Sequence, residues 1–434
     1  MADHQCLVLH AAELVTLADL GPGPHRGPLP ELTTIADGAV WSVDGVVRDV
    51  GTTAEVLQRL PVSAAPEVID ARGCAVIPGL VDPHTHLLYD GSREDEYHLR
   101  LAGTSYLEIG RRGGGIQRTV AATRSAGFAR LLRGLEDRLD RALAGGTTTV
   151  EVKTGYGLDT AAEIEGLDVI RAAQRTHPAD IVPTFLGAHA IAPEFRGAPD
   201  RYTDLVVGEM LPRARGLAAF CDVFCEEGYF TREQSRRILA EGKRLGLLPK
   251  IHADEVSDQG GAALAAEVGA ASADHLCCAA EDGLRAMAAA GVVAVVLPAT
   301  RFYFLAERYA DARRMLALGL PLALGTDHSP TTPVDSMLLV IGLACAELKL
   351  TAAEALVAAT LNAAAALGVQ NRVGRLAPGS QADLVVLHVP SHRDIPYYFA
   401  RPLVRNVLKR GRPIDLARLS PSPVPERRYE EAGS

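Results

Sequence analysis

Two histidines stand one residue apart in the stretch GLVDPHTHLLYDGSRE, and an arginine follows seven residues after the second. His84 and His86 close the apolar run AVIPGLVDPHTH, residues 75–86, a few residues after its Pro-Gly pair, and such a run is typical of a β-strand. Side chains at positions i and i+2 of a strand point to the same face. The pair can therefore offer two imidazoles to one metal ion, although a single strand histidine is more often a packing or surface residue.

Polar residues close other apolar runs in the same way. The runs alternate with Ala/Leu/Arg/Glu-rich segments that have helical periodicity and end at glycine. Eight such units in roughly 290 residues predict an α/β fold, a (β/α)₈ TIM-like barrel. An open doubly wound sheet is the alternative, but no G-x-G-x-x-G follows the first strand. Six of the thirteen histidines fall at the predicted strand ends: His84, His86, His189, His252, His275 and His328.

Both ends of the chain have a different pattern of short strands and turns. AVWSVDGVVRDVG alternates around an Asp-Gly turn, which indicates a hairpin, and GRLAPGSQADLVVLHV near the other end has short strands as well. We expect residues 1–76 and 368–434 to join into one small β-sandwich domain, because chain ends often meet in space. The barrel then covers residues 77–367.

Composition excludes several classes of protein. The net charge of −9 and the lack of a Lys/Arg run argue against nucleic acid as a partner. No apolar run approaches the roughly 20 residues that span a membrane, and the N-terminus does not resemble a signal peptide. The seven cysteines are scattered without a C-x-x-C pair, which favours free thiols in a reducing compartment over metal ligands. We expect a cytoplasmic protein with neither nucleic acid nor membrane as a partner.

Catalytic residues of such a barrel project from the carboxyl ends of its strands, so the candidate metal ligands are the polar residues at the predicted strand ends. His252 lies across the barrel from the first strand, and Asp327 closes the last strand beside it. With His84 and His86 they form three imidazoles and one carboxylate, which suit one zinc or iron ion per subunit, divalent or trivalent. Lys153 could bridge a second ion if carbamylated, but a structural or substrate-facing lysine is the favoured interpretation.

The remaining polar residues at the strand ends suggest a hydrolytic site. Glu255, in HADE, can take a proton from a metal-activated water and pass it to a leaving nitrogen; Asp254 is the competing base. His275 is a candidate for polarising a carbonyl. Arg93 has the shape to bind a substrate carboxylate, and Tyr156 could add a hydroxyl.

Several stretches carry a family resemblance. H-T-H and H-A-D-E alone indicate the metal-dependent amidohydrolases. DGSREDEYHLRLAGTSYLEIGRRGGGIQRTVAATR, GTTTVEVKTGYGLD and DVFCEEGYF are more specific, and they closely resemble the imidazolonepropionases within that superfamily. The resembling stretches span roughly residues 76 to 300, and LNAAAALG and GRLAPGSQADLVVL extend the likeness toward the C-terminus.

The resemblance implies a function and a set of residues. It implies opening of 4-imidazolone-5-propanoate by water to N-formimidoyl-L-glutamate, in histidine degradation, by a cytosolic homodimer. It implies that the predicted ligands bind the metal ion, that Glu255 transfers protons and that His275 lies near the reacting carbonyl. It implies substrate contacts from Arg93, Tyr106, Tyr156 and His189.

One loop departs from the family pattern. Where the family usually has Asp-Phe-Asn-Pro-Gly-Ser, this chain has Asp-His-Ser-Pro-Thr-Thr over residues 327–332. The resemblance makes Ser329, Thr331 and Thr332 substrate-binding, but Ser329 lacks the NH₂ donor of asparagine, and His328 adds an imidazole beside Asp327. The alternative that follows is an amidohydrolase or deaminase for another carboxylate-bearing nitrogen heterocycle. A non-catalytic binding protein is an alternative from a different class, which the presence of all four predicted ligands and Glu255 disfavours.

Overall fold

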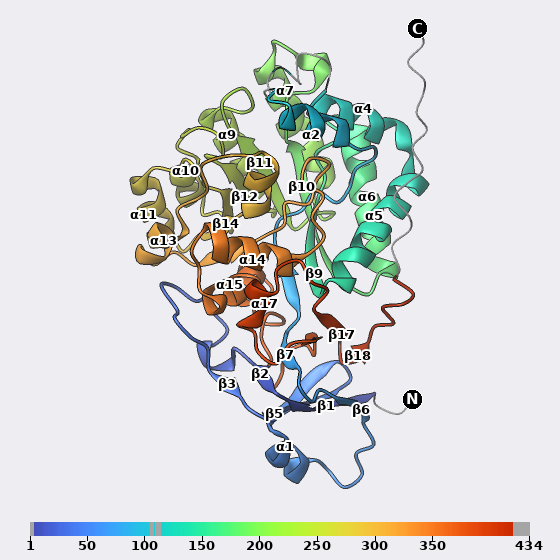
Figure 1. Cartoon of the computed structure of the whole chain (residues 1–434). Helices are drawn as coiled ribbons and strands as arrows, with labels where there is room; N and C mark the ends of the chain where they lie inside the picture. The colour runs from blue at the N-terminus through green and yellow to red at the C-terminus, as the bar shows by residue number, and fades with distance from the viewer. Residues whose placement is uncertain (1–3, 105–107, 109–113, 420–434) are drawn as a thin grey trace.

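The protein is described by a computed structural model that covers residues 4–104, 108 and 114–419 (Figure 1). Its centre is a sheet of parallel strands in the order β15-β14-β13-β12-β11-β10-β9-β8. The sheet confirms the predicted TIM-like barrel, with one strand for each of the eight predicted runs. The strands are β8 (Leu80–Asp82), β9 (Thr147–Lys153), β10 (Asp180–Ala188), β11 (Phe220–Cys225), β12 (Leu248–Ala253), β13 (Ser272–His275), β14 (Val293–Val296) and β15 (Leu322–Leu324).

Helices connect the strands and cover the outside of the sheet (Figure 1). Several begin at a cap that the sequence encodes: Thr231 and Gln234 form a capping box at α9, and Asp159 accepts a hydrogen bond from the Ala162 N–H at α6. The helices between barrel strands are α2 (Glu94–Leu101), α4 (Ile116–Ala126), α5 (Phe128–Ala144), α6 (Thr160–Thr176), α7 (Pro199–Leu205), α8 (Leu211–Ala214), α9 (Arg232–Arg244), α10 (Gly261–Val268), α11 (Glu281–Ala290), α12 (Pro298–Tyr303) and α13 (Ala312–Ala317). After β15 come α14 (Met337–Glu347), α15 (Ala352–Ala358) and α16 (Leu361–Ala366).

A second region of two sheets contains strands from both ends of the chain. One sheet has the order β5-β4-β1-β6, and the other has the order β18-β17-β16-β7-β2-β3. Residues of both sheets share an apolar core, as a sandwich requires. In Figure 1 the blue N-terminal strands and the red β17 and β18 lie together below the barrel. The strands are β1 (Gln5–Ala11), β2 (Glu13–Val15), β3 (Thr34–Ile35), β4 (Gly38–Val43), β5 (Val46–Thr52), β6 (Glu67–Asp70), β7 (Ala75–Pro78), β16 (Leu384–Leu387), β17 (Val404–Lys409) and β18 (Arg412–Pro413), with α1 (Thr53–Arg59) beside them. The short helix α17 (Asp394–Tyr397), between β16 and β17, packs against α14 of the barrel.

The chain passes from one region to the other at Gly79. The first predicted run, residues 75–86, is in fact divided, because β7 pairs with β2 and β16 while only β8 enters the barrel. A Cβ at Gly79 would lie 2.3 Å from the Thr148 hydroxyl oxygen, so only glycine fits at this crossing. The domain boundaries at residues 76 and 368 stay predictions.

The barrel closes between its first and last strands, just past their ends. The Asp327 N–H donates to the His84 carbonyl at 3.0 Å, and the His86 N–H donates to the His328 carbonyl at 2.8 Å. Thr85 and His328 form a parallel bridge at the same place. The two histidines and the aspartate predicted to bind metal are therefore part of the seam of the barrel.

The interior of the barrel next to this seam is charged. Glu151, Lys153, Asp222, Lys250 and Asp274 are fully buried, whereas such layers are usually filled by branched apolar side chains. Among the described residues, no helix is long and apolar enough to cross a membrane.

Candidate metal centre and active site

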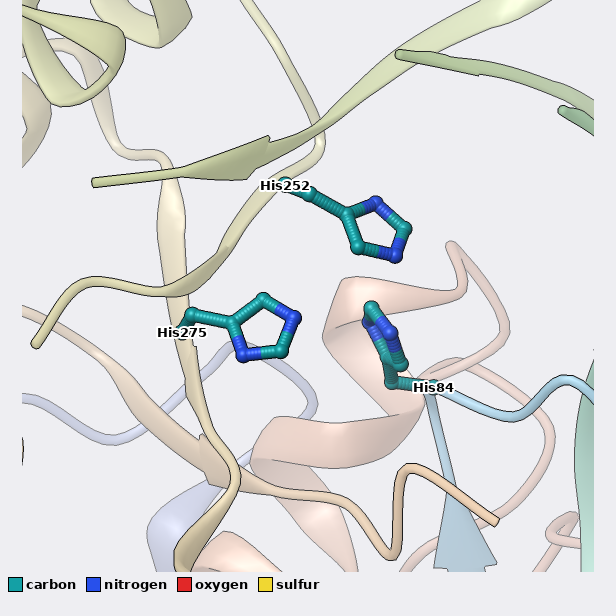
Figure 2. Close-up of side chains that lie close together, drawn as sticks. All are labelled: His84, His252 and His275. Carbon is teal, nitrogen blue, oxygen red and sulfur yellow. The ribbon is translucent and has the colours of Figure 1, made fainter. Parts of the chain in front are cut away.

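Four of the predicted imidazoles converge at the carboxyl end of the barrel. His84 and His86 follow β8, His252 lies on β12 and His275 ends β13, and all four are at most 3% exposed. Figure 2 shows the rings of His84, His252 and His275 turned toward a common space. One ring nitrogen from each of these three lies within 4.8 Å of those of the other two. Coordination of one ion by side chains from opposite parts of the barrel is therefore geometrically possible.

Asp327 completes this arrangement from the last strand. Its Oδ1 lies 3.5 Å from the Nε2 of His84 and 3.3 Å from the Nε2 of His86. The Nε2 of His86 lies 3.3 Å from the Nε2 of His252. The four ligands predicted from the sequence thus lie together, with three nitrogens and one carboxylate oxygen facing the same space.

Two buried carboxylates set the orientation of two of these rings. Asp274 Oδ2 lies 2.5 Å from the Nδ1 of His84, and Asp222 Oδ1 lies 3.1 Å from the Nδ1 of His252. A carboxylate only accepts hydrogen bonds, so each Nδ1 donates, and the Nε2 atoms are the ones directed at the shared space. Metal-binding histidines are held in this way by carboxylates in many proteins.

The residues present fit a metal ion. The Nε2 of His84 is buried and has no hydrogen-bond partner among the described residues, as expected of an atom reserved for coordination. Burial lowers the pKa of His86 to about 4, so that ring is neutral and can coordinate. Burial and Lys153 lower the pKa of His84, but Asp274 and Asp327 outweigh them and raise it to about 9. Metal binding at His84 must then release a proton, which makes the affinity rise with pH.

Three of the convergent histidines, His86, His252 and His275, line a cavity of about 730 Å³. This volume suits a small-molecule ligand. One wall is aromatic, because the rings of Phe224 and Tyr229 pack 4.3 Å apart. The polar lining comes from His86, Arg93, Arg100, Thr104, Tyr156, His189, Glu226, Glu227, His252, Glu255, Ser257, His275, Thr300, Asp327, Ser329 and Thr331.

Glu255 lines this cavity and Asp254 does not, which separates the two candidate bases. Asp254 accepts hydrogen bonds from the backbone N–H groups of Gln259, Gly261 and Ala262, so it caps α10. Burial, followed by the Asp327 carboxylate, raises the pKa of Glu255 to about 8. A carboxyl group in this range can both accept and donate a proton near neutral pH.

His275 lies beside Glu255, with its Nδ1 3.8 Å from Glu255 Oε1. Burial holds the pKa of His275 well below its ordinary value, so the ring is neutral and can donate one hydrogen bond. Its backbone has φ +75°, a left-handed conformation that is strained for histidine. Such strain is common at functional sites, where it aims a side chain.

The predicted substrate contacts lie around the same cavity where the structure describes them. His189 donates from Nδ1 to the Gly155 carbonyl at 3.0 Å and stacks on His86, and Tyr156 packs against His189. Arg93 is buried, and its Nε and Nη2 bind Glu96 Oε2 at 2.9 and 2.7 Å. Glu96 thus orients the guanidinium at the edge of the cavity. Tyr106 lies outside the described residues.

The divergent loop contributes two hydroxyls to the cavity. Ser329 and Thr331 line it and lie 3.1 Å apart through their side-chain oxygens. Thr332 is fully buried outside the lining and pairs with Ser329 through the backbone. His328 points away: its Nδ1 lies 3.0 Å from Asp335 Oδ1, and its Nε2 lies 3.3 Å from the Tyr89 hydroxyl. The imidazole expected beside the metal aspartate therefore belongs to the packing behind the seam.

Of the charged layer beneath the histidines, sequence reasoning assigned a role only to Lys153. Lys153 Nζ binds Asp222 Oδ2 at 2.7 Å and Glu151 Oε2 at 2.8 Å, while Lys250 Nζ lies 3.0 Å from Glu151 Oε1. Lys153 is thus an ion-pair partner inside the barrel, which agrees with its structural interpretation. The sequence did contain a signal for this layer, because charged residues such as Lys250 occur two positions from a site residue such as His252 and so share its face of a buried strand.

The fold and the site can be compared with those of known protein families. Residues 103–415 match the amidohydrolase family, and this chain belongs to that family. Adenosine deaminase from Xanthomonas campestris with bound zinc has a similar structure, with a TM-score of 0.70, 21% identity and 96% of each chain covered. The 5-methylcytosine deaminase from Klebsiella pneumoniae has a TM-score of 0.71, with 17% identity, 94% of this chain covered and 97% of the other. At these identities the likeness shows the shared fold.

Closer relatives place the chain within the family. Imidazolonepropionase from Geobacillus kaustophilus is 49% identical, over 93% of this chain and 96% of its own length. The Symbiobacterium thermophilum imidazolonepropionase is 50% identical, over 94% of this chain and 96% of its own length. The imidazolonepropionase from Haloarcula marismortui is 50% identical, over 88% of this chain and 90% of its own length. Among the amidohydrolases, the chain thus groups with the imidazolonepropionases, and a metal cofactor and a small-molecule substrate follow from the family.

Replacement of Asp274 by asparagine tests the carboxylate support of the metal ligands. We expect Asp274→Asn to weaken zinc affinity on the order of 10- to 100-fold, because the His84 ring loses its charged partner. Chelator competition measures the affinity. Asp140→Asn, which removes the carboxylate partner of His177 away from the site, is the control and should bind zinc as the unaltered protein does. Equal losses in both variants would contradict the assignment.

Proposed function

We propose that this chain hydrolyses the cyclic amide bond of 4-imidazolone-5-propanoate to give N-formimidoyl-L-glutamate, in histidine degradation. The observation that carries the proposal is the convergence of His84, His86, His252 and Asp327 next to the cavity that Glu255 lines, in a chain that groups with the imidazolonepropionases. We assign the first four as ligands of one zinc or iron ion per subunit. A cytoplasmic location and a homodimer remain predictions from the sequence.

The chemistry needs an activated water and a polarised carbonyl. A bound zinc or iron ion supplies Lewis acidity and lowers the pKa of a water. Glu255 takes a proton from the attacking water, whose oxygen adds to the ring carbonyl carbon. The carbon–nitrogen bond then breaks, and Glu255 returns the proton to the leaving ring nitrogen. His275 donates a hydrogen bond to the carbonyl oxygen, where negative charge develops.

The rest of the cavity would hold the substrate. Arg93, oriented by Glu96, binds the propionate carboxylate. Tyr156 and His189, which lie beside the His86 ring, contact the substrate ring. The Ser329 and Thr331 hydroxyls face the cavity where the family has an amide and a glycine. Two hydroxyls keep both donors and acceptors there, which is compatible with the same polar substrate.

Turnover of freshly prepared imidazolone propionate by zinc- or iron-loaded protein tests the proposed reaction. Formimidoylglutamate should form, and Glu255→Gln should lower kcat by about 10²- to 10⁴-fold with unchanged metal content, because the proton carrier is lost. Asp258→Asn, an exposed change in the same loop, is the matched control. No product from the unaltered protein would refute the substrate and leave the metal site standing.

Arg93 is tested by the dependence of rate on substrate concentration. Arg93→Ala should raise KM by a factor on the order of 10 to 100, because one charge-assisted contact to the carboxylate is lost. Arg118→Ala removes an exposed arginine paired with Asp95 and serves as the control. A KM that stays the same in Arg93→Ala would exclude the carboxylate clamp.

A further inference from the structure

We propose that Glu226 is a positioning residue for proton transfer, because it anchors the loop that carries Glu255 and so holds the Glu255 carboxylate in the cavity. Nothing in the sequence pattern or the proposed reaction assigns Glu226 a role. The inference rests on the proposed function for its catalytic part, since Glu255 is the proton carrier of that reaction.

The contacts of Glu226 are directed at the residues immediately after Glu255. Glu226 follows β11 and is 3% exposed. Its Oε2 accepts the backbone N–H of Val256 at 2.9 Å and that of Ser257 at 3.4 Å. Its Oε1 accepts the Ser257 hydroxyl and the Glu227 N–H. One buried carboxylate thus joins the loop after β11 to the loop after β12.

The carboxylate is committed to these donors. Two peptide N–H groups, one hydroxyl and the N–H of its own neighbour already occupy its two oxygens. A carboxylate with four donors is poorly available as a base for substrate. Hydrogen bonds to a charged acceptor are stronger than neutral ones, so the contact is suited to holding backbone in place.

A second carboxylate holds the same loop from the other side. Asp254, with φ +52°, accepts the N–H groups of Gln259 and Gly261, and the Asp254 carbonyl accepts the Cys278 N–H at 2.7 Å. Glu255 therefore lies between two anchored residues, Asp254 and Val256. Rotation of its backbone is restricted on both sides, and its side chain is directed into the cavity.

Glu226 itself stands on a rigid turn. Its N–H donates to the Phe230 carbonyl at 3.2 Å, its carbonyl accepts the Tyr229 N–H at 3.0 Å, and Cys225 forms a bridge with Phe230. The anchor is therefore fixed to the end of β11, which pairs with β12. The position of Glu255 relative to the metal ligands is then set by two neighbouring strands together.

A double-mutant cycle tests whether Glu226 acts through Glu255. Glu226→Ala should lower kcat about 100-fold, as a catalytic group displaced by about 1 Å does, with KM and zinc content within about twofold. Glu226→Gln keeps the length and one acceptor oxygen and should recover part of the loss. In a Glu255→Gln background, Glu226→Ala should cause no further loss, because residues that act as a unit are not additive. Additive losses would overturn the proposal.

Amide hydrogen exchange tests the anchor without reference to activity. In Glu226→Ala the exchange of Val256 and Ser257 should accelerate by about tenfold or more, since their acceptor is gone. Glu233→Ala, which removes an exposed carboxylate at the start of α9, should leave exchange and kcat unchanged. Unchanged exchange at Val256 and Ser257 in Glu226→Ala would overturn the proposal. Lack of turnover by the unaltered protein would instead count against the proposed substrate.

Discussion

The site depends on two buried carboxylates, Asp222 and Asp274, that hold the rings of His252 and His84. Each accepts a hydrogen bond from Nδ1 and so directs Nε2 into the space between β8 and β12. Burying carboxylates is costly unless they are paired. Lys153 and Lys250 supply the positive charge, which explains why this layer of the barrel is ionic rather than apolar. A metal ion above the layer adds further positive charge beside the carboxylates.

The same segments that carry the site also complete the fold. Hydrogen bonds from Asp327 to the His84 carbonyl and from His86 to the His328 carbonyl close the barrel between β8 and β15. His328 secures this seam through Asp335 and Tyr89 instead of facing the cavity. Three of the proposed metal ligands are therefore placed by the closure of the barrel, so the geometry of the site and the stability of the seam are linked.

Sequence reasoning predicted the barrel because most of its strands are short apolar runs that end in polar residues and alternate with helical segments, a pattern that is visible in the sequence itself. His252 and Asp327 could be grouped with His84 and His86 because barrel strands present their carboxyl ends at one face. The division at Gly79 could not be predicted, since β7 and β8 form one apolar run and differ only in their strand partners. The contact of Asp222 with His252 and the direction of the His328 ring depend on how the chain folds around them, and the role proposed for Glu226 depends on the loop after the adjacent strand.

X-ray absorption spectroscopy of the zinc-loaded protein tests the central claim most directly, because it counts the kinds of atoms bound to the ion. The account predicts nitrogen and oxygen ligands at about 2.0–2.2 Å, with the multiple-scattering pattern of three imidazoles. A sulfur ligand at about 2.3 Å, or a pattern from fewer than three imidazoles, would contradict the site formed by His84, His86, His252 and Asp327.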